Sequence, residues 1–146
     1  MKHAVGLILA AGRGSRMKGL TGDRPKCLTE LAGRPLLHWQ LDALRTGGAA
    51  PLLVVGGYLG HMLEPEAQGM PADAYATLEN PAWARTNMLS TLLCAAPWLE
   101  RQFDQGAGQA VISYSDIVYH PGHVAALLAH PDHVAITYDT LWEPLW

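Results

Sequence analysis

Charge is scarce in this sequence: Asp, Glu, Lys and Arg together make up 16% of the residues, and the formal net charge is −3 at pH 7. A mildly acidic chain offers no broad basic surface, so we expect no nucleic-acid partner. No apolar run approaches the ~20 residues that a membrane-spanning helix needs, so we expect no membrane association and a cytoplasmic location. The two cysteines, Cys27 and Cys94, form no Cys-x-x-Cys pair, which predicts neither a disulfide framework nor a zinc site.

Several catalytic motifs are missing as well. The sequence has no Gly-Lys-Ser or Gly-Lys-Thr, which excludes a Walker phosphate loop, and no Gly-x-Ser-x-Gly, which argues against a serine hydrolase. Two His-x-x-His pairs occur at positions 120/123 and 130/133, but each contains a proline and no cysteine lies near. We interpret them as structural or surface histidines and not as zinc ligands.

The residues that are present describe one globular domain with many turns. Hydrophobic residues make up 49% of the 146 positions, and 15 glycines and 10 prolines supply turn residues. The cations are unevenly placed, because seven of the ten fall within the first 34 positions: Lys2, Arg13, Arg16, Lys18, Arg24, Lys26 and Arg34. Such a cluster indicates either a site for a small anion or a solvated charged loop.

Apolar runs alternate with helical periodicity along the chain. The apolar run after Lys2 superficially resembles a secretion signal, but it is short and cations follow it, so we interpret it as a buried strand. Proline at 35 suits the first turn of a helix, and proline at 97 is expected to stop one. The predicted strands are His3–Ala10, Pro51–Val55, Tyr75–Leu78, Gln109–Tyr114 and His133–Tyr138, and the predicted helices are 35–46, 86–96 and 121–130.

This alternation predicts an α/β fold, a three-layer sandwich with a mostly parallel, Rossmann-like sheet. In such sheets ligands bind beyond the carboxyl ends of the strands. The rule directs attention to 12–26, 80–87, 115–116 and 139–140.

A glycine loop follows the first predicted strand directly. Gly12-Arg13-Gly14-Ser15-Arg16-Met17 begins like a dinucleotide fingerprint, but Met17 stands where the third glycine is needed. What remains is a loop whose backbone N–H groups can approach an anion closely, or simply a tight turn.

The longer strings resemble a known superfamily. LAAGRGSRM (9–17), followed by Arg24-Pro25-Lys26, resembles the signature of nucleotidyltransferases that activate sugar phosphates and phosphocholine. The segment 80–88 looks like the part that these enzymes place against base and ribose, and 113–116 looks like their strand end with a metal-binding Asp. The resemblance covers essentially the whole chain and is strongest to the bacterial phosphocholine cytidylyltransferase group.

The resemblance implies Mg²⁺-dependent transfer of CMP from CTP to phosphocholine or a similar small phosphate or phosphonate, with release of pyrophosphate. Sugar 1-phosphate transfer and a non-catalytic nucleotide-binding regulatory module are the alternatives. By the same resemblance Arg16 would hold the β- and γ-phosphates, Lys26 would bridge the α-phosphate and the acceptor, and Asp116 would bind Mg²⁺. The other implied nucleotide-binding residues are Leu9, Ala11, Gly12, Gly14, Ser15, Asn80, Thr86, Asn87 and Ser115.

Each of these roles has a plainer alternative. Asp116 could cap the turn after its strand, Lys26 could be an exposed turn lysine, and Arg16 an ordinary surface arginine. The reaction itself needs cations and a metal more than a protein nucleophile, because a phosphomonoester with a second pKa near ~6 is already ionised at pH 7.

The end of the chain, 138–146, combines aromatic and acidic residues. Asp139 and Trp142 are therefore predicted to bind the acceptor, since aromatic faces with acidic neighbours can hold a quaternary ammonium. The equal alternative is that these aromatics, with Trp146, pack against the rest of a domain or a partner chain. Family members that this chain resembles continue further, so we expect residues 1–146 to be a nucleotidyltransferase domain missing its C-terminal part, with a homodimer as a possible assembly.

Overall fold

A computed structural model describes residues 3–143. The strands are β1 (His3–Ala10), β2 (Glu30–Leu31), β3 (Arg34–Pro35), β4 (Ala49–Gly56), β5 (Ala76–Glu79) and β6 (Ala107–Tyr114). The α-helices are α1 (Leu36–Thr46), α2 (Met88–Cys94), α3 (Ala96–Asp104) and α4 (Pro121–Ala129), and short 3-10 helices are η1 (Ser15–Thr21), η2 (Lys26–Leu28), η3 (Gly60–Leu63) and η4 (Glu66–Gln68).

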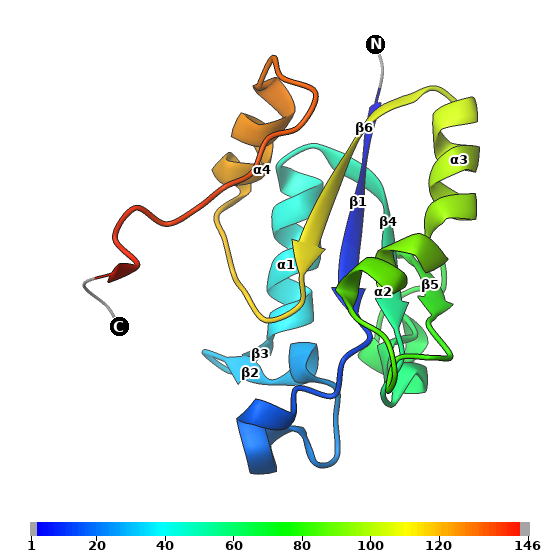
Figure 1. The fold of residues 1–146 in the computed structure, drawn as a ribbon, viewed down its shortest axis with the longest axis vertical. Coiled ribbons are helices and arrows are strands. Elements are labelled where there is room, and N and C mark those ends of the chain that lie inside the picture. The colour runs from blue at the N-terminus through cyan, green and yellow to red at the C-terminus, as the bar shows by residue number, and fades with distance from the viewer. Residues whose placement is uncertain (1–2, 144–146) are drawn as a thin grey trace.

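Four strands form one parallel sheet in the order β5-β4-β1-β6. The central strand β1 is buried along almost its whole length, as its continuous apolar run predicts. Helices α1 and α4 cover one face of the sheet, and α2 and α3 cover the other (Figure 1). The predicted three-layer α/β fold is confirmed.

The two faces of β1 and β4 supply two separate cores, because side chains alternate along a strand. Ile8 and Val54 pack with Leu37 and Leu41 of α1. On the opposite face, Leu7 and its neighbours pack against the α2–α3 layer, which includes Trp98. Because the four strands are parallel, their carboxyl ends lie at the same edge of the sheet, where the glycine loop after β1 also lies (Figure 1).

Two sequence predictions are wrong in detail. Pro97 does not end the helical region: α2 stops at Cys94, and α3 begins with a proline in its first turn, where the missing N–H has no helical partner to lose. The predicted strand His133–Tyr138 is irregular, and its apolar side chains Val134 and Ile136 are more than four-fifths exposed. Within residues 3–143 no helix is both long and apolar enough to cross a bilayer.

Candidate active site

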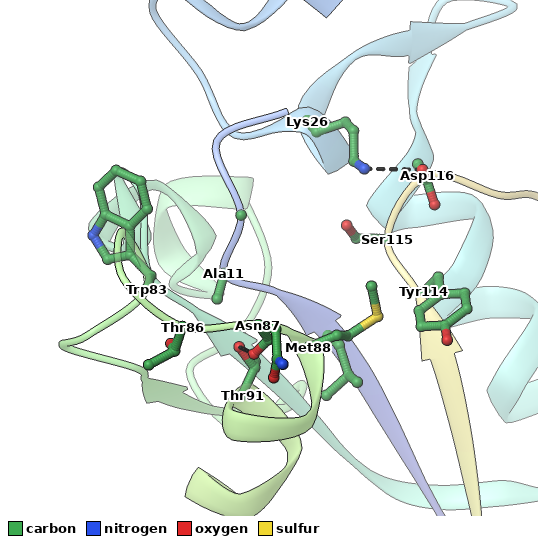
Figure 2. A pocket seen from close by; sticks show the side chains of 12 residues that line it. Ala11, Lys26, Trp83, Thr86, Asn87, Met88, Thr91, Tyr114, Ser115 and Asp116 are labelled. Atoms are coloured by element: carbon green, nitrogen blue, oxygen red, sulfur yellow. Dashed lines mark hydrogen bonds and ion pairs between the residues drawn. The ribbon is translucent and has the colours of Figure 1, made fainter. Parts of the chain in front are cut away.

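A pocket opens at the carboxyl ends of β1 and β6, with a cavity of about 240 Å³. Segments far apart in sequence surround it: the loop after β1, the start of η2, the connection into α2 and the turn after β6 (Figure 2). The lining residues are Leu9, Ala11, Gly12, Lys26, Trp83, Thr86, Asn87, Met88, Thr91, Tyr114, Ser115 and Asp116.

The glycine loop packs tightly onto the stem of Lys26. Gly14 has φ +68°, and a Cβ added there would lie only 3.0 Å from the Cβ of Lys26. Its carbonyl accepts hydrogen bonds from the backbone N–H of Met17 at 2.9 Å and from the Thr21 hydroxyl at 3.1 Å. A left-handed backbone and a close approach both require glycine here, so the loop and the lysine form one unit.

Lys26 and Asp116 meet at the pocket although 90 positions separate them. The Lys26 Nζ lies 2.9 Å from Asp116 Oδ2, and the side chains are 25% and 46% exposed (Figure 2). Lys26 starts η2, whose next residues, Cys27 and Leu28, are buried and anchor it. Burial raises the pKa of the Cys27 thiol to about 12, so this neighbour is a protonated packing group and not a nucleophile.

The opposite wall is held by a buried amide. Asn80 Nδ2 donates to the hydroxyls of Thr86 and Thr91, each at 3.1 Å, and Asn80 Oδ1 accepts from the backbone N–H of Ala82 at 3.0 Å. Asn87, the N-cap of α2, accepts from the backbone N–H of Ser90 at 3.2 Å. Both predicted asparagines therefore shape the wall, and Asn87 also faces the pocket.

Aromatic rings connect this wall to the glycine loop. The rings of Tyr58 and Trp83 meet edge to face at 5.3 Å, and the guanidinium of Arg13 lies 5.4 Å from the Tyr58 ring centroid. The Tyr58 hydroxyl lies 3.1 Å and 3.0 Å from the carbonyls of Thr21 and Gly22. Tyr58 thus ties the far end of the loop to the pocket wall.

The structure brings most predicted site residues together. Eight line the pocket: Leu9, Ala11, Gly12, Lys26, Thr86, Asn87, Ser115 and Asp116. Gly14, Ser15 and Arg16 lie beside it on the loop and the start of η1, with Arg16 exposed, and Asn80 lies behind the wall. The segment after α4 runs away from the sheet (Figure 1). Asp139 and Trp142 belong to this segment by their numbers and do not line the pocket, and Trp146 falls outside the described residues.

Four residues that line the pocket were not predicted as site residues: Trp83, Met88, Thr91 and Tyr114. Trp83, Met88 and Tyr114 fall within the motif segments 80–88 and 113–116, whereas Thr91 and the nearby Tyr58 fall outside them. Thr91 and Tyr58 carry no local signal, because their partners are distant in the chain. Gln40, which donates a hydrogen bond to the carbonyl of Ile117 next to Asp116, does carry a local signal: it occupies the buried stripe of α1 that Leu37 and its neighbouring leucines also occupy. A polar residue on such a stripe calls for a hydrogen-bonding partner inside the protein.

The residues present fit a magnesium ion only with help from a ligand. Among the described residues, no three His, Cys, Asp or Glu side chains come together to hold a metal. Of the carboxylates in the described part of the chain, Asp116 is the one that lines the pocket. This suits Mg²⁺, which commonly takes one or two protein carboxylates and completes its shell with phosphate oxygens and water.

Known proteins match this chain in sequence and in fold. The sequence model of the MobA-like NTP transferase domain matches residues 6–146. A curated relative, CTP:phosphoglutamine cytidylyltransferase of Campylobacter jejuni, is 34% identical over 140 residues, which are 96% of this chain and 54% of the relative.

Two solved structures share the fold. CTP:phosphocholine cytidylyltransferase from Streptococcus pneumoniae aligns with a TM-score of 0.65 at 23% identity, covering 78% of this chain and 45% of that one. The inositol-1-phosphate CTP transferase from T. maritima aligns with a TM-score of 0.70 at 20% identity, covering 90% and 50%. The chain therefore spans about half the length of these proteins.

Proposed function

The chain belongs to the MobA-like NTP transferase domain family, and from this premise we propose that its pocket binds CTP for cytidylyl transfer. The acceptor is phosphocholine or a similar small phosphate or phosphonate, and pyrophosphate is released. The names of the three similar proteins support the proposal, since each pairs CTP or cytidylyl transfer with a phosphorylated small molecule.

The observation that carries the proposal is the Lys26–Asp116 pair beside the glycine loop. An ammonium and a carboxylate 2.9 Å apart neutralise one another until a polyanion arrives. A triphosphate would then replace the carboxylate as the partner of Lys26 and leave Asp116 facing a cation. Lys26 would thus bind the triphosphate, and Asp116 would bind the metal that accompanies it.

The chemistry requires positioning and charge neutralisation, which these residues can supply. An oxygen of the acceptor phosphate forms a bond to the α-phosphorus, and the bond from that phosphorus to the bridging oxygen breaks. The electron pair leaves with pyrophosphate. Because the acceptor is already ionised at pH 7, no general base is needed, and Lys26 acts by stabilising the charge that develops around the α-phosphate.

Magnesium would be held by Asp116 and would supply further charge neutralisation to the phosphates. Arg16 lies on η1, beyond the pocket on the side of the glycine loop, where its exposed guanidinium suits the β- and γ-phosphates. A cavity of about 240 Å³ is smaller than the ~300–1,000 Å³ of typical ligand pockets. It therefore has room for only part of the nucleotide, and the β- and γ-phosphates would lie outside the cavity, toward Arg16.

The test combines binding with turnover. Calorimetry measures the affinity for CTP, UTP, ATP and GTP with Mg²⁺, and a pyrophosphate-release assay then pairs each nucleotide with phosphocholine, other small phosphates and phosphonates, and sugar 1-phosphates. We expect CTP to bind most tightly and to react fastest. Asp116→Asn serves as the matched control that removes one charge at constant shape.

Other outcomes point to the alternatives. Faster reaction with UTP, ATP or GTP overturns the choice of CTP. A preference for sugar 1-phosphates moves the acceptor to that class. Tight binding of CTP without turnover on any acceptor indicates a nucleotide-binding regulatory module.

A further inference from the structure

Helix α1 carries a polar side chain in its core-facing stripe. Gln40 is fully buried, one residue before Leu41 and three after Leu37, which are fully buried as well. A buried amide is costly unless its donors and acceptor are paired. A leucine or methionine would suit packing better, so the position needs a reason other than the core.

The partner of this amide is the turn that holds Asp116. Gln40 Nε2 donates to the backbone carbonyl of Ile117 at 2.5 Å. Gln40 Oε1 is buried and has no hydrogen-bond partner among residues 3–143. The amide is thus used for one bond only, and that bond fixes the backbone immediately after the carboxylate.

A second hydrogen bond spans the same turn. The Tyr119 hydroxyl donates to Ser113 Oγ at 2.8 Å, which closes the segment onto the end of β6. Ser115, just before Asp116, is buried. The Asp116 side chain remains 46% exposed, so its position is set by the backbone on either side and by Lys26.

Helix α1 also packs against η2, the element that begins at Lys26. One helix therefore supports both members of the ion pair: η2 through packing and the Asp116 turn through Gln40. The distance between the ammonium and the carboxylate depends on both supports.

We propose that Gln40 is a positioning residue that holds the Asp116 turn in the geometry needed for the metal–nucleotide complex. The functional part of this proposal rests on the proposed function, because it assumes that Asp116 binds Mg²⁺. Groups that orient a metal-binding side chain commonly contribute roughly 10–100-fold to metal affinity or activity. The unpaired Oε1 is the cost to the fold, of the kind that proteins tolerate at functional sites.

The test replaces the amide with a side chain of similar length. Gln40→Met removes the bond to Ile117 and also removes the unpaired oxygen, so we expect a Tm close to or above that of the parent. Hydrogen exchange should accelerate at the amides of 115–118 and remain unchanged in β1 and β4. Affinity for CTP with Mg²⁺ should fall roughly 10–100-fold, while affinity for CTP in EDTA should not change.

The matched control is Gln68→Met. Gln68 also holds a loop carbonyl, that of Met62 at 2.6 Å, but its Oε1 is paired with His38 at 2.9 Å and it lies away from the pocket. This variant should lower the Tm and leave both the 115–118 amides and the magnesium dependence of CTP binding unchanged.

Unchanged exchange at 115–118 in Gln40→Met would overturn the proposal. Faster exchange with an unchanged magnesium dependence would also overturn it, because Gln40 would then serve the fold alone. If the parent binds no CTP, the proposed function fails, whereas the exchange measurement still decides whether Gln40 holds the turn. Should Gln40→Met fail to fold, Gln40→Leu, which also lacks the N–H donor to Ile117 and the unpaired oxygen, provides the same comparison.

Discussion

The buried amide of Asn80 offers the sharpest test of how the pocket wall is built. Its side chain makes three hydrogen bonds, to Thr86, Thr91 and the backbone of Ala82. At a net ~0.5–1.5 kcal/mol each, Asn80→Ala should lower the free energy of unfolding by about 2–4 kcal/mol. This is a large share of the 5–15 kcal/mol, roughly, that holds a domain together. At about 3–4 °C per kcal/mol, the Tm should fall by roughly 6–16 °C.

The matched control is the same substitution at Asn87. That side chain is exposed and makes one capping bond, to the backbone N–H of Ser90 at 3.2 Å. Loss of an N-cap costs about 1 kcal/mol. Urea unfolding of both variants measures the difference directly, provided that the slope of the free energy against denaturant stays equal to that of the parent.

An Asn80→Ala variant no less stable than Asn87→Ala would refute the reasoning. It would mean that the hydroxyls of Thr86 and Thr91 find other partners at no cost. A changed slope of free energy against urea would instead show that the substitution alters the compactness of the unfolded or the folded state. The stabilities of the two variants would then be compared by calorimetry at the Tm.

Four further outcomes follow from the site and the core. Lys26→Met should keep a urea midpoint near that of the parent, because a partly exposed ion pair contributes at most ~1 kcal/mol to stability. Its kcat should fall roughly 10²–10³-fold, and a near-normal kcat excludes the role assigned to Lys26. Asp116→Asn should weaken CTP binding by calorimetry with Mg²⁺ and not in EDTA, and equal metal dependence in variant and parent excludes it as a ligand. Tyr58→Phe, which loses only the hydroxyl that meets the 21–22 carbonyls, should raise KM for CTP more than it lowers kcat, and a change in kcat alone would contradict this. Burial raises the pKa of Cys27 from 9.0 to about 12, so above pH 9.0 the unfolded chain loses this proton while the folded state keeps it. The free energy of unfolding should therefore fall as pH rises above 9.0, by up to ~1.4 kcal/mol per pH unit. Urea titrations of Cys27→Ala should show a smaller fall.

Most of the sheet could be predicted because its signals are local. The apolar run His3–Ala10 is buried on both faces and gives the central strand β1. The runs that became β4, β5 and β6 lie within a few residues of their predicted bounds. Helix α1 followed from the spacing of its leucines, since period 3.6 is visible without any knowledge of the partner.

Only those residues of the site that lie at strand ends or in recognisable motifs could be predicted from the sequence. Lys26 and Asp116 were expected near one another because parallel strands deliver their carboxyl ends to a single edge, and their side chains now lie 2.9 Å apart. Tyr58 and Thr91 could not be found this way, because each acts through a hydrogen bond to a segment at least 11 residues away. Gln40 was visible in principle as a polar residue on an apolar stripe, but its partner Ile117 was not.

The segment His133–Tyr138 shows why a correct local pattern can still predict the wrong structure. Its β-branched and aromatic residues favour an extended backbone, yet a strand exists only when a neighbour completes its hydrogen-bond ladder. Within residues 3–143 the sheet ends at β6, and no ladder joins 133–138 to it. Ile136 instead shares an apolar cavity with Ile112 and Tyr114 of that edge strand, close to the sheet but unpaired with it. Periodicity therefore predicts which segments prefer to be extended, and contacts between distant parts of the chain decide which of them enter the sheet.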